Sequence, residues 1–256
     1  MRCLLFCLLL TRLLTAEPVA VRYVEGSLHG FLSLRSMEGK LLASGDLTQE
    51  VHGSRVISHL VYRFKDGSLD DETAVFTQRG TFRLVSDRHI QKGPAFPTPT
   101  DTLINVATGM VTVHYQEKGK PKIASEHMDL PPDLANGVIL DILKNIPPKS
   151  IQTKLSWIAA TPKPRLVKLS VTAPATETFS IAGISHNSTR LDLKIEIGGL
   201  AGLIAPVIGK QPPDIHIWIS DGAVPAFVKS EGPQALGGPA WRIELMTPAW
   251  ASASKE

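Results

Sequence analysis

The chain has 256 residues, of which 27 are Lys or Arg and 24 are Asp or Glu, so its formal net charge is only +3. Because the basic residues are scattered, the sequence lacks the concentrated positive charge that nucleic-acid binding or attachment to an anionic membrane requires. A chain of this length can bury a large hydrophobic core without disulfides or metals.

Residues 1–16 have the pattern of a secretory signal peptide. Arg2 supplies a positive charge, and residues 3–10 form an unbroken apolar stretch that is too short to anchor a helix across a bilayer. We expect cleavage after Ala16, and therefore a protein that is exported to the periplasm or the cell exterior. Cleavage would remove both cysteines together with Arg2 and Arg12, and would lower the net charge to +1. No later stretch approaches the roughly eighteen apolar residues of a transmembrane helix.

The first half of the exported chain is predicted to be a meander of β-strands. Its apolar runs are separated by turn residues, and the pairs Asp66-Gly67 and Arg79-Gly80 are typical of hairpin turns. The alternation of apolar and polar residues is only partial, which indicates a sheet that is covered on both faces over part of its length. The strands are expected at residues 21–35, 40–51, 54–65, 72–78, 80–91, 102–107, 110–116 and 122–128.

One helix is predicted near the middle of the chain, over residues 133–146. Leu134, Val138 and Ile142 recur at a spacing of four, which places them on one face of a helix, and proline pairs flank the segment on both sides. A single amphipathic helix in a β protein packs its apolar stripe against a sheet or fills the open end of a barrel.

The second half again has the pattern of strands, and Thr189 to Ile197 alternates strictly between apolar and charged residues. Many short strands with frequent turn signals are typical of a barrel or sandwich. The predicted fold is therefore mainly β: a large curled antiparallel sheet or open barrel with one central amphipathic helix. Residues 17–250 are treated as one β-rich domain, in which two stranded halves flank the helix, and 251–256 as a disordered tail. The later strands are expected at residues 151–160, 164–172, 176–184, 188–197, 214–220, 224–230 and 240–246.

This succession of a signal peptide, meandering strands, one helix between proline pairs and further strands resembles the periplasmic open β-barrel proteins of bacteria. These include the carriers that localise lipoproteins and related uncharacterised families. The resemblance is one of pattern and transfers no individual residue. In those carriers an incomplete barrel holds acyl chains in an apolar cavity, so the resemblance implies a lipid, a lipidated partner or another apolar ligand.

No recognised catalytic or metal-binding motif occurs in the sequence. The eight histidines form no His-Glu-x-x-His pair and no cluster with cysteine, and the acidic stretch 66–72 lacks the spacing of a calcium loop. There is also no Gly-x-Ser-x-Gly nucleophile elbow. We therefore assign no catalytic residue, metal ligand or cofactor.

The most unusual segment is the uncharged stretch 198–209, which links two strand patterns. Its large apolar residues fit one helical face, so the segment is either a short buried element that covers the sheet or an apolar flap that contacts a ligand or a membrane. As candidate ligand-binding residues we take those of this segment and one aromatic residue of the following strand: Leu200, Leu203, Ile204, Val207, Ile208 and Trp218.

Three functional hypotheses follow from these patterns. The leading one is a non-enzymatic, exported cell-envelope protein that binds an apolar ligand such as a lipid or a lipidated partner. The second is a hydrolase whose polar residues come from distant strands, with His127, Asp129, His186 and His216 as candidates by residue type. The third is a structural or scaffolding protein of the envelope. The sequence sets no oligomeric state.

Overall fold

The computed structural model of the chain describes residues 18–147, 152–181, 184–196, 213–235 and 237–246. The predicted signal peptide and the predicted disordered tail lie outside these ranges, so both remain predictions.

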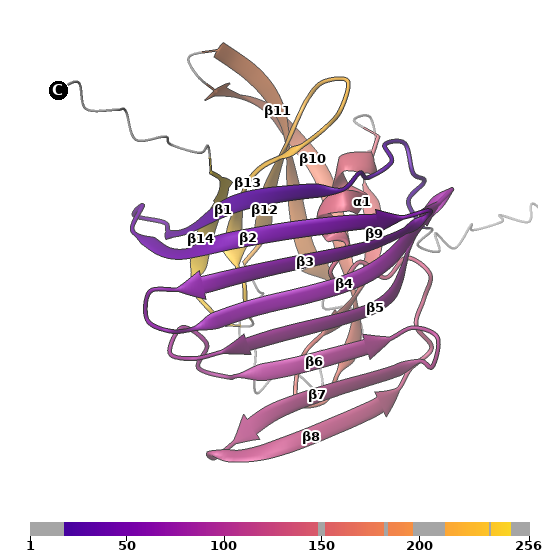
Figure 1. Cartoon of the computed structure of the whole chain (residues 1–256), viewed down its shortest axis with the longest axis vertical. Coiled ribbons are helices and arrows are strands. Elements are labelled where there is room, and N and C mark those ends of the chain that lie inside the picture. Colours follow the sequence, from indigo (N-terminus) through magenta and orange to yellow (C-terminus); the bar gives the residue numbers. More distant parts are fainter. Residues whose placement is uncertain (1–17, 148–151, 182–183, 197–212, 236, 247–256) are drawn as a thin grey trace, which may run out of the picture.

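In the described part of the chain, fourteen strands form one antiparallel sheet, which curls around a short helix without closing (Figure 1). The strands are β1 (Leu28–Ser36), β2 (Leu41–His52), β3 (Arg55–Phe64), β4 (Leu69–Arg79), β5 (Thr81–Lys92), β6 (Thr100–Asn105), β7 (Met110–Glu117), β8 (Lys120–His127), β9 (Thr153–Ala159), β10 (Arg165–Ile181), β11 (Ile184–Glu196), β12 (Ile215–Ser220), β13 (Phe227–Pro233) and β14 (Ala240–Leu245). This arrangement confirms the predicted fold class.

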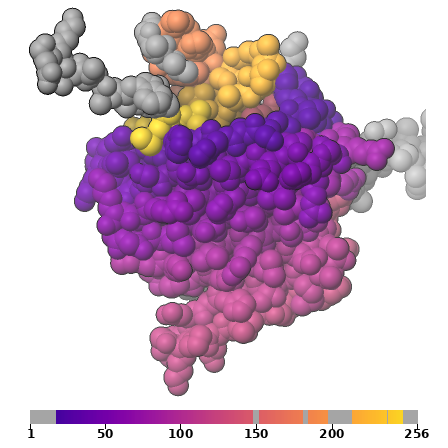
Figure 2. Space-filling model, in the orientation of Figure 1, coloured from indigo at the N-terminus to yellow at the C-terminus, as the bar shows by residue number. Residues whose placement is uncertain are grey.

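The sheet consists of two meanders that are joined by a single pairing. Strands β1 to β8 lie side by side in chain order, strands β9 to β14 do the same, and β1 pairs with β14. At that junction Leu34 lies opposite Ile243. Strands β8 and β9 are therefore the two ends of the sheet. Figure 2 shows the outer face of the first meander as one broad surface.

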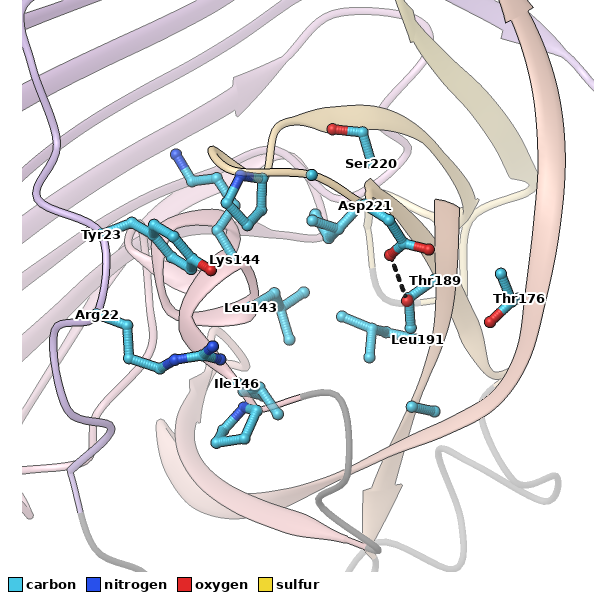
Figure 3. Close-up of a pocket in the computed structure, with 15 residues that line it drawn as sticks. Arg22, Tyr23, Leu143, Lys144, Ile146, Thr176, Thr189, Leu191, Ser220 and Asp221 are labelled. Atoms are coloured by element: carbon cyan, nitrogen blue, oxygen red, sulfur yellow. Dashed lines mark hydrogen bonds between the residues drawn. The ribbon is translucent and has the colours of Figure 1, made fainter. Parts of the chain in front are cut away.

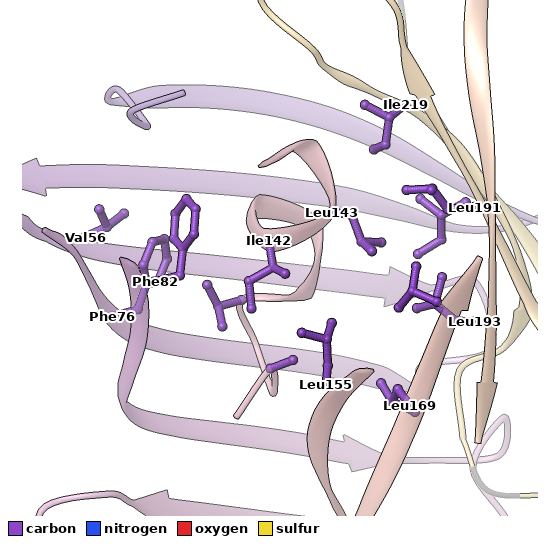
Figure 4. Close-up of a cluster of buried hydrophobic side chains, with 14 residues drawn as sticks. Val56, Phe76, Phe82, Ile142, Leu143, Leu155, Leu169, Leu191, Leu193 and Ile219 are labelled. Carbon is purple, nitrogen blue, oxygen red and sulfur yellow. The ribbon is translucent and has the colours of Figure 1, made fainter. Parts of the chain in front are cut away.

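The helix α1 (Ile139–Asn145) lies inside the curl and connects the cores of the two meanders. Ile142 and Leu143 are each 2% exposed and belong to one buried cluster with Phe76 and Phe82 of the first meander and Leu191 of the second (Figure 4). Burying side chains of this size contributes about 1.5–3 kcal/mol each. The helix thus supplies one of the contacts between the meanders, beside the pairing of β1 with β14 and a second cluster in which Leu34 and Phe64 pack with Trp241 and Ile243.

The helix is shorter than predicted, because residues 133–138 are not helical. Gly137 has a φ of +62°, which a right-handed helix does not allow, and Leu134 forms a parallel bridge with Ser156 of β9. The apolar residues of this segment recur at a helical spacing although the segment is not helical. The spacing alone therefore could not reveal where the helix begins. No helix in the described part of the chain is long and apolar enough to cross a membrane.

The first strand also begins later than predicted, since β1 starts at Leu28. The preceding residues form an extended segment outside the sheet, in which Val21 N donates to Gly80 O at 2.9 Å and Ala20 bridges to Thr81. The segment then passes over α1. Its alternation resembles that of a strand, but it forms no continuous ladder: its polar contacts are with the turn at Gly80, with α1, and with side chains of β2 and β4.

Two predicted strands, 164–172 and 176–184, are one continuous strand, β10. Pro174 cannot donate a ladder hydrogen bond, and the pairing with β11 shifts register between Thr172 and Ala175. A bulge of this kind absorbs a proline without ending the strand. The proline therefore marks an irregularity within one strand, and not the gap between two strands that was predicted.

Candidate functional site

A cavity of about 260 Å³ lies between α1 and the inner face of β10, β11 and β12 (Figure 3). Leu143 of the helix and Leu191 of β11 face each other across it, and Ala173 and Ile219 complete an apolar wall. The cavity exists because one helix of seven residues is too short to cover the inner face of the long strands β10 and β11 together with β12.

The mouth of the cavity is polar. Arg22 and Tyr23 lie on one side, with the Arg22 guanidinium carbon 5.3 Å from the centre of the Tyr23 ring. On the other side Thr189 Oγ1 donates to Asp221 Oδ1 at 2.8 Å. Within the described ranges no carboxylate pairs with Arg22, so its charge is free to meet a ligand. The site combines an apolar wall with a polar mouth, which has the Arg22 cation on one side and the Asp221 carboxylate on the other.

Arg22 and Tyr23 are fixed in place by the end of the helix. The backbone N–H groups of both residues donate to Oδ1 of Asn145, each at 2.7 Å, and Asn145 Nδ2 donates to the carbonyl of Asp141 at 2.8 Å. Asn145 is completely buried, where unpaired polar groups would be costly. One amide side chain thus ties the N-terminal segment to α1.

Lys144, Glu25 and Asp141 form a buried ion-pair network next to the mouth. Lys144 Nζ lies 2.8 Å from Glu25 Oε1 and 3.0 Å from Asp141 Oδ1. Burial raises the pKa of Asp141 to about 6, although Lys144 acts in the opposite direction. Burial alone would lower the pKa of Lys144, but the two carboxylates outweigh it and raise that pKa. Lys144 is therefore already neutralised by protein groups, which leaves Arg22 as the cation at the mouth.

A second polar cluster lies on the inner face of β4 and β5. His89 Nε2 is 2.6 Å from Asp70 Oδ1, and His89 Nδ1 is 3.9 Å from Glu72 Oε1. Burial opposes the charge on His89, but Glu72, Asp70 and Asp87 outweigh it and raise the pKa of His89 to about 10. Burial and the Glu72 carboxylate raise the pKa of Asp87 well above its usual value. The described residues include no group of His, Cys, Asp and Glu side chains that is arranged to hold a metal.

A serine and a lysine lie together at β9 and β10, but the serine is inaccessible. Lys168 Nζ is 2.6 Å from Ser156 Oγ, which donates to both carboxylate oxygens of Asp133. Ser156 is 0% exposed, so no substrate can reach its hydroxyl group. The arrangement fastens the segment before α1 to the end of the sheet.

The predicted ligand-binding residues do not line this cavity as far as the structure describes them. Leu200, Leu203, Ile204, Val207 and Ile208 fall outside the described residues, so their role is untested.

Trp218 is buried on the face of β12 opposite to Ile217 and Ile219, which belong to the core around α1. Its Nε1 donates to Glu177 Oε2 at 2.8 Å, and its ring centre lies 4.0 Å from Lys229 Nζ. The side chain is thus held by charged neighbours, away from the cavity.

The four candidate hydrolase residues have separate surroundings. His216 Nδ1 lies 2.6 Å from Asp192 Oδ1 on the outer face. His186 is exposed on β11 and packs against Phe179, and His127 and Asp129 are exposed at the end of β8. None of the four lines the cavity, and within the described ranges no hydrogen bond or ion pair joins any two of them.

Sequence reasoning identified the walls of the cavity only as core. The alternation in β11 places Leu191 on the buried face, and the apolar stripe includes Leu143, but neither pattern reveals that the two side chains leave a space between them. Arg22 and Tyr23 gave no motif at all. Their position depends on Asn145, which is more than 120 residues away in the chain.

No family model matches this chain, and no curated protein matches it in sequence. A solved structure that is similar is a beta-barrel-like protein of domain of unknown function DUF1849 from Brucella abortus, with a TM-score of 0.47 and 8% identity; the match covers 91% of this chain and 98% of that one. A likeness of this degree carries no argument about function. The sheet itself defines the class: a mainly β protein with a curled, unclosed antiparallel sheet around a short helix.

Proposed function

We propose that this protein is an exported, non-enzymatic protein of the cell envelope that binds an apolar or amphipathic ligand inside its curled sheet. The observation that carries the proposal is the cavity between α1 and β10 to β12, with Leu143, Leu191 and Ile219 in its wall and Arg22 at its mouth. Ligand sites are typically concave and mainly apolar, with a few polar groups that orient the ligand.

The volume and the charges of the cavity narrow the class of ligand. A cavity of about 260 Å³ is slightly smaller than the roughly 300–1,000 Å³ of sites for drug-sized molecules. It suits one hydrocarbon chain or one small apolar group better than a whole membrane lipid. A carboxylate or phosphate at the end of such a chain would meet Arg22, whose planar guanidinium group binds these anions well.

The proposal is tested with the exported chain, purified with and without removal of bound lipids by organic solvent. Native mass spectrometry of the untreated protein is expected to show an adduct, and the delipidated protein is expected to bind a fluorescent long-chain fatty acid. The substitution Ala173→Leu, which adds bulk to the cavity wall, is expected to weaken binding at least tenfold. Thr178→Leu is the matched control, since Thr178 is exposed on the same strand and does not line the cavity.

An untreated protein with no adduct, together with a delipidated protein that binds no fatty acid, would overturn the proposal and favour a scaffolding role. Equal losses of binding in the Ala173→Leu and Thr178→Leu variants would place the ligand elsewhere on the molecule. Both variants are first compared with the parent protein by thermal unfolding, so that misfolding is not mistaken for lost binding.

A further inference from the structure

The two ends of the sheet differ in how they are covered. At β9 the end is partly closed, because Leu134 bridges to Ser156 and Ala135 N donates to Ser156 O at 2.9 Å. At β8 no described strand lies beyond the border of the sheet (Figure 1). A free strand edge presents unpaired N–H and C=O groups that can pair with another strand.

The turn between β7 and β8 determines which residues of β8 present these groups. It has two central residues, Lys118 and Gly119, both with positive φ, so the pair Glu117–Lys120 that closes it exchanges both backbone hydrogen bonds. At the other end of β8, Met128 N donates to Gly109 O at 2.8 Å, so the even-numbered residues pair with β7 along the whole strand. The outward residues therefore alternate with the paired ones: Pro121, Ile123, Ser125 and His127.

We propose that β8 pairs antiparallel with β8 of a second copy of this chain, about a two-fold axis at Ala124. This register places the outward residue Ile123 of one copy opposite the outward residue Ser125 of the other, so the two can exchange hydrogen bonds. It also places Lys122 opposite Glu126, once on each side of the axis. Cross-strand pairs of opposite charge stabilise antiparallel strands.

Opposite charges favour this register, and they favour a second copy as the partner. Lys122 and Glu126 lie on the same face of β8 as Ala124, and neither forms an ion pair with another described residue. A shift by one outward position away from the turn would place Glu126 opposite alanine and lose both charge pairs. A shift towards the turn would place Lys122 opposite alanine and replace the pairs by Lys120 with Glu126, at the very end of the strand beside the turn. The chosen register opposes no two like charges, and the small Ala124 side chains meet at the axis, where the strands approach closely.

Pro121 limits the length of the pairing. It lies at an outward position and has no N–H to donate. The backbone N–H donors along the edge are therefore those of Ile123, Ser125 and His127. A contact through one strand edge is small, and small interfaces are typical of weak, transient association. We therefore expect a dimer that forms reversibly, with a dissociation constant above about 1 µM.

The experiment is sedimentation equilibrium of the exported chain at concentrations up to about 1 mM, chosen to cover weak interfaces. Lys122→Glu, which opposes two glutamates on each side of the axis, is expected to weaken the dimer about tenfold or more. Adding Glu126→Lys to that variant is expected to restore it. Lys120→Glu is the matched control, because it makes the same charge change on the same strand face, where the register places Met128 opposite.

Hydrogen exchange tests the register residue by residue. The amides of Ile123, Ser125 and His127 are expected to become more protected as the concentration rises, while those of Lys122 and Ala124 are already protected by β7. A chain that stays monomeric at 1 mM, a double charge reversal that does not restore the dimer, or equal effects of Lys120→Glu and Lys122→Glu would overturn the proposal. A monomer that binds an added extended peptide at the same edge would also overturn it, in favour of a foreign partner.

Discussion

Lys144 Nζ lies 2.8 Å from Glu25 Oε1, so the helix inside the sheet is joined by charge to the segment that precedes the first strand. The lysine side chain is 14% exposed and the glutamate side chain 9%. Gln78 also accepts a hydrogen bond from the backbone N–H of Glu25 at 2.7 Å. Because the same helix forms one wall of the cavity, this pair connects the stability of the fold to the shape of the proposed site.

Replacement of Lys144 by methionine is expected to lower the free energy of unfolding by about 3–5 kcal/mol, because it leaves Glu25 and Asp141 buried without a counter-charge. Urea unfolding measures the loss, with Lys40→Met as an exposed control that changes stability by less than about 0.5 kcal/mol. Neutralising all three side chains, with Glu25→Gln and Asp141→Asn added, should recover part of the loss. A single variant that loses less than about 1 kcal/mol would contradict this view of the network.

Gly137 explains why the helix begins late, and its substitution tests that explanation. A Cβ at this position would lie 2.5 Å from Ala74 Cβ and 2.8 Å from Asp87 Oδ1. Gly137→Ala is expected to cost about 1–2 kcal/mol for the positive φ and about 1–3 kcal/mol more for the overlap. Gly39 has a φ of +92°, and a Cβ added there would meet no atom within 4 Å. Gly39→Ala should therefore cost only the free energy of the positive φ. Equal losses in thermal or urea unfolding would show that the overlap relaxes freely.

His89 should make the stability of the protein depend on pH. Its pKa is raised from the usual value near 6.5 to about 10 by Glu72, Asp70 and Asp87 against the effect of burial. A raised pKa means that the folded state holds the proton more tightly than the unfolded state does. The stabilisation is therefore complete below about pH 6.5 and is lost as the pH rises towards 10.

The measurement is the thermal midpoint of the parent protein and of His89→Gln at intervals between pH 6 and 10. The difference between the two should be largest at the acidic end and shrink as the pH rises. His29→Gln is the control, since His29 is 53% exposed beside Asp46. A constant difference over the whole range would show that His89 is not protonated in the folded state.

Export is tested at the N-terminus. We expect the exported chain to begin at Glu17, because Ala16 is a small residue at a workable distance from the apolar stretch 3–10. N-terminal sequencing of the protein from the exported fraction gives the answer. Recovery of Met1 in that fraction would show that the apolar start is retained.

The length of the helix could not be predicted from the sequence pattern. The apolar spacing of Leu134, Val138 and Ile142 is that of a helix, yet Leu134 ends in a bridge to β9 and only the later part is helical. Gly137 carries a local indication against the helix, but its weight depends on Ala74 and Asp87, which surround it only in the folded state. In the same way, Pro174 looks like a strand end until the partner strand shifts register to accommodate it.

The sequence by itself determined the mainly β class and the approximate strands, because alternation and turn residues act between neighbours in the chain. It also indicated the buried face of β11 and the apolar stripe of α1, but not the burial of Asp141 and Asn145. Only the tertiary structure decided that Leu143 and Leu191 enclose a cavity, that Arg22 lies at its mouth, and that β8 borders the sheet formed by the described strands. Each of these depends on which distant segments meet. That choice is made by packing and by buried hydrogen bonds such as those of Asn145, which leave no periodic trace in the sequence.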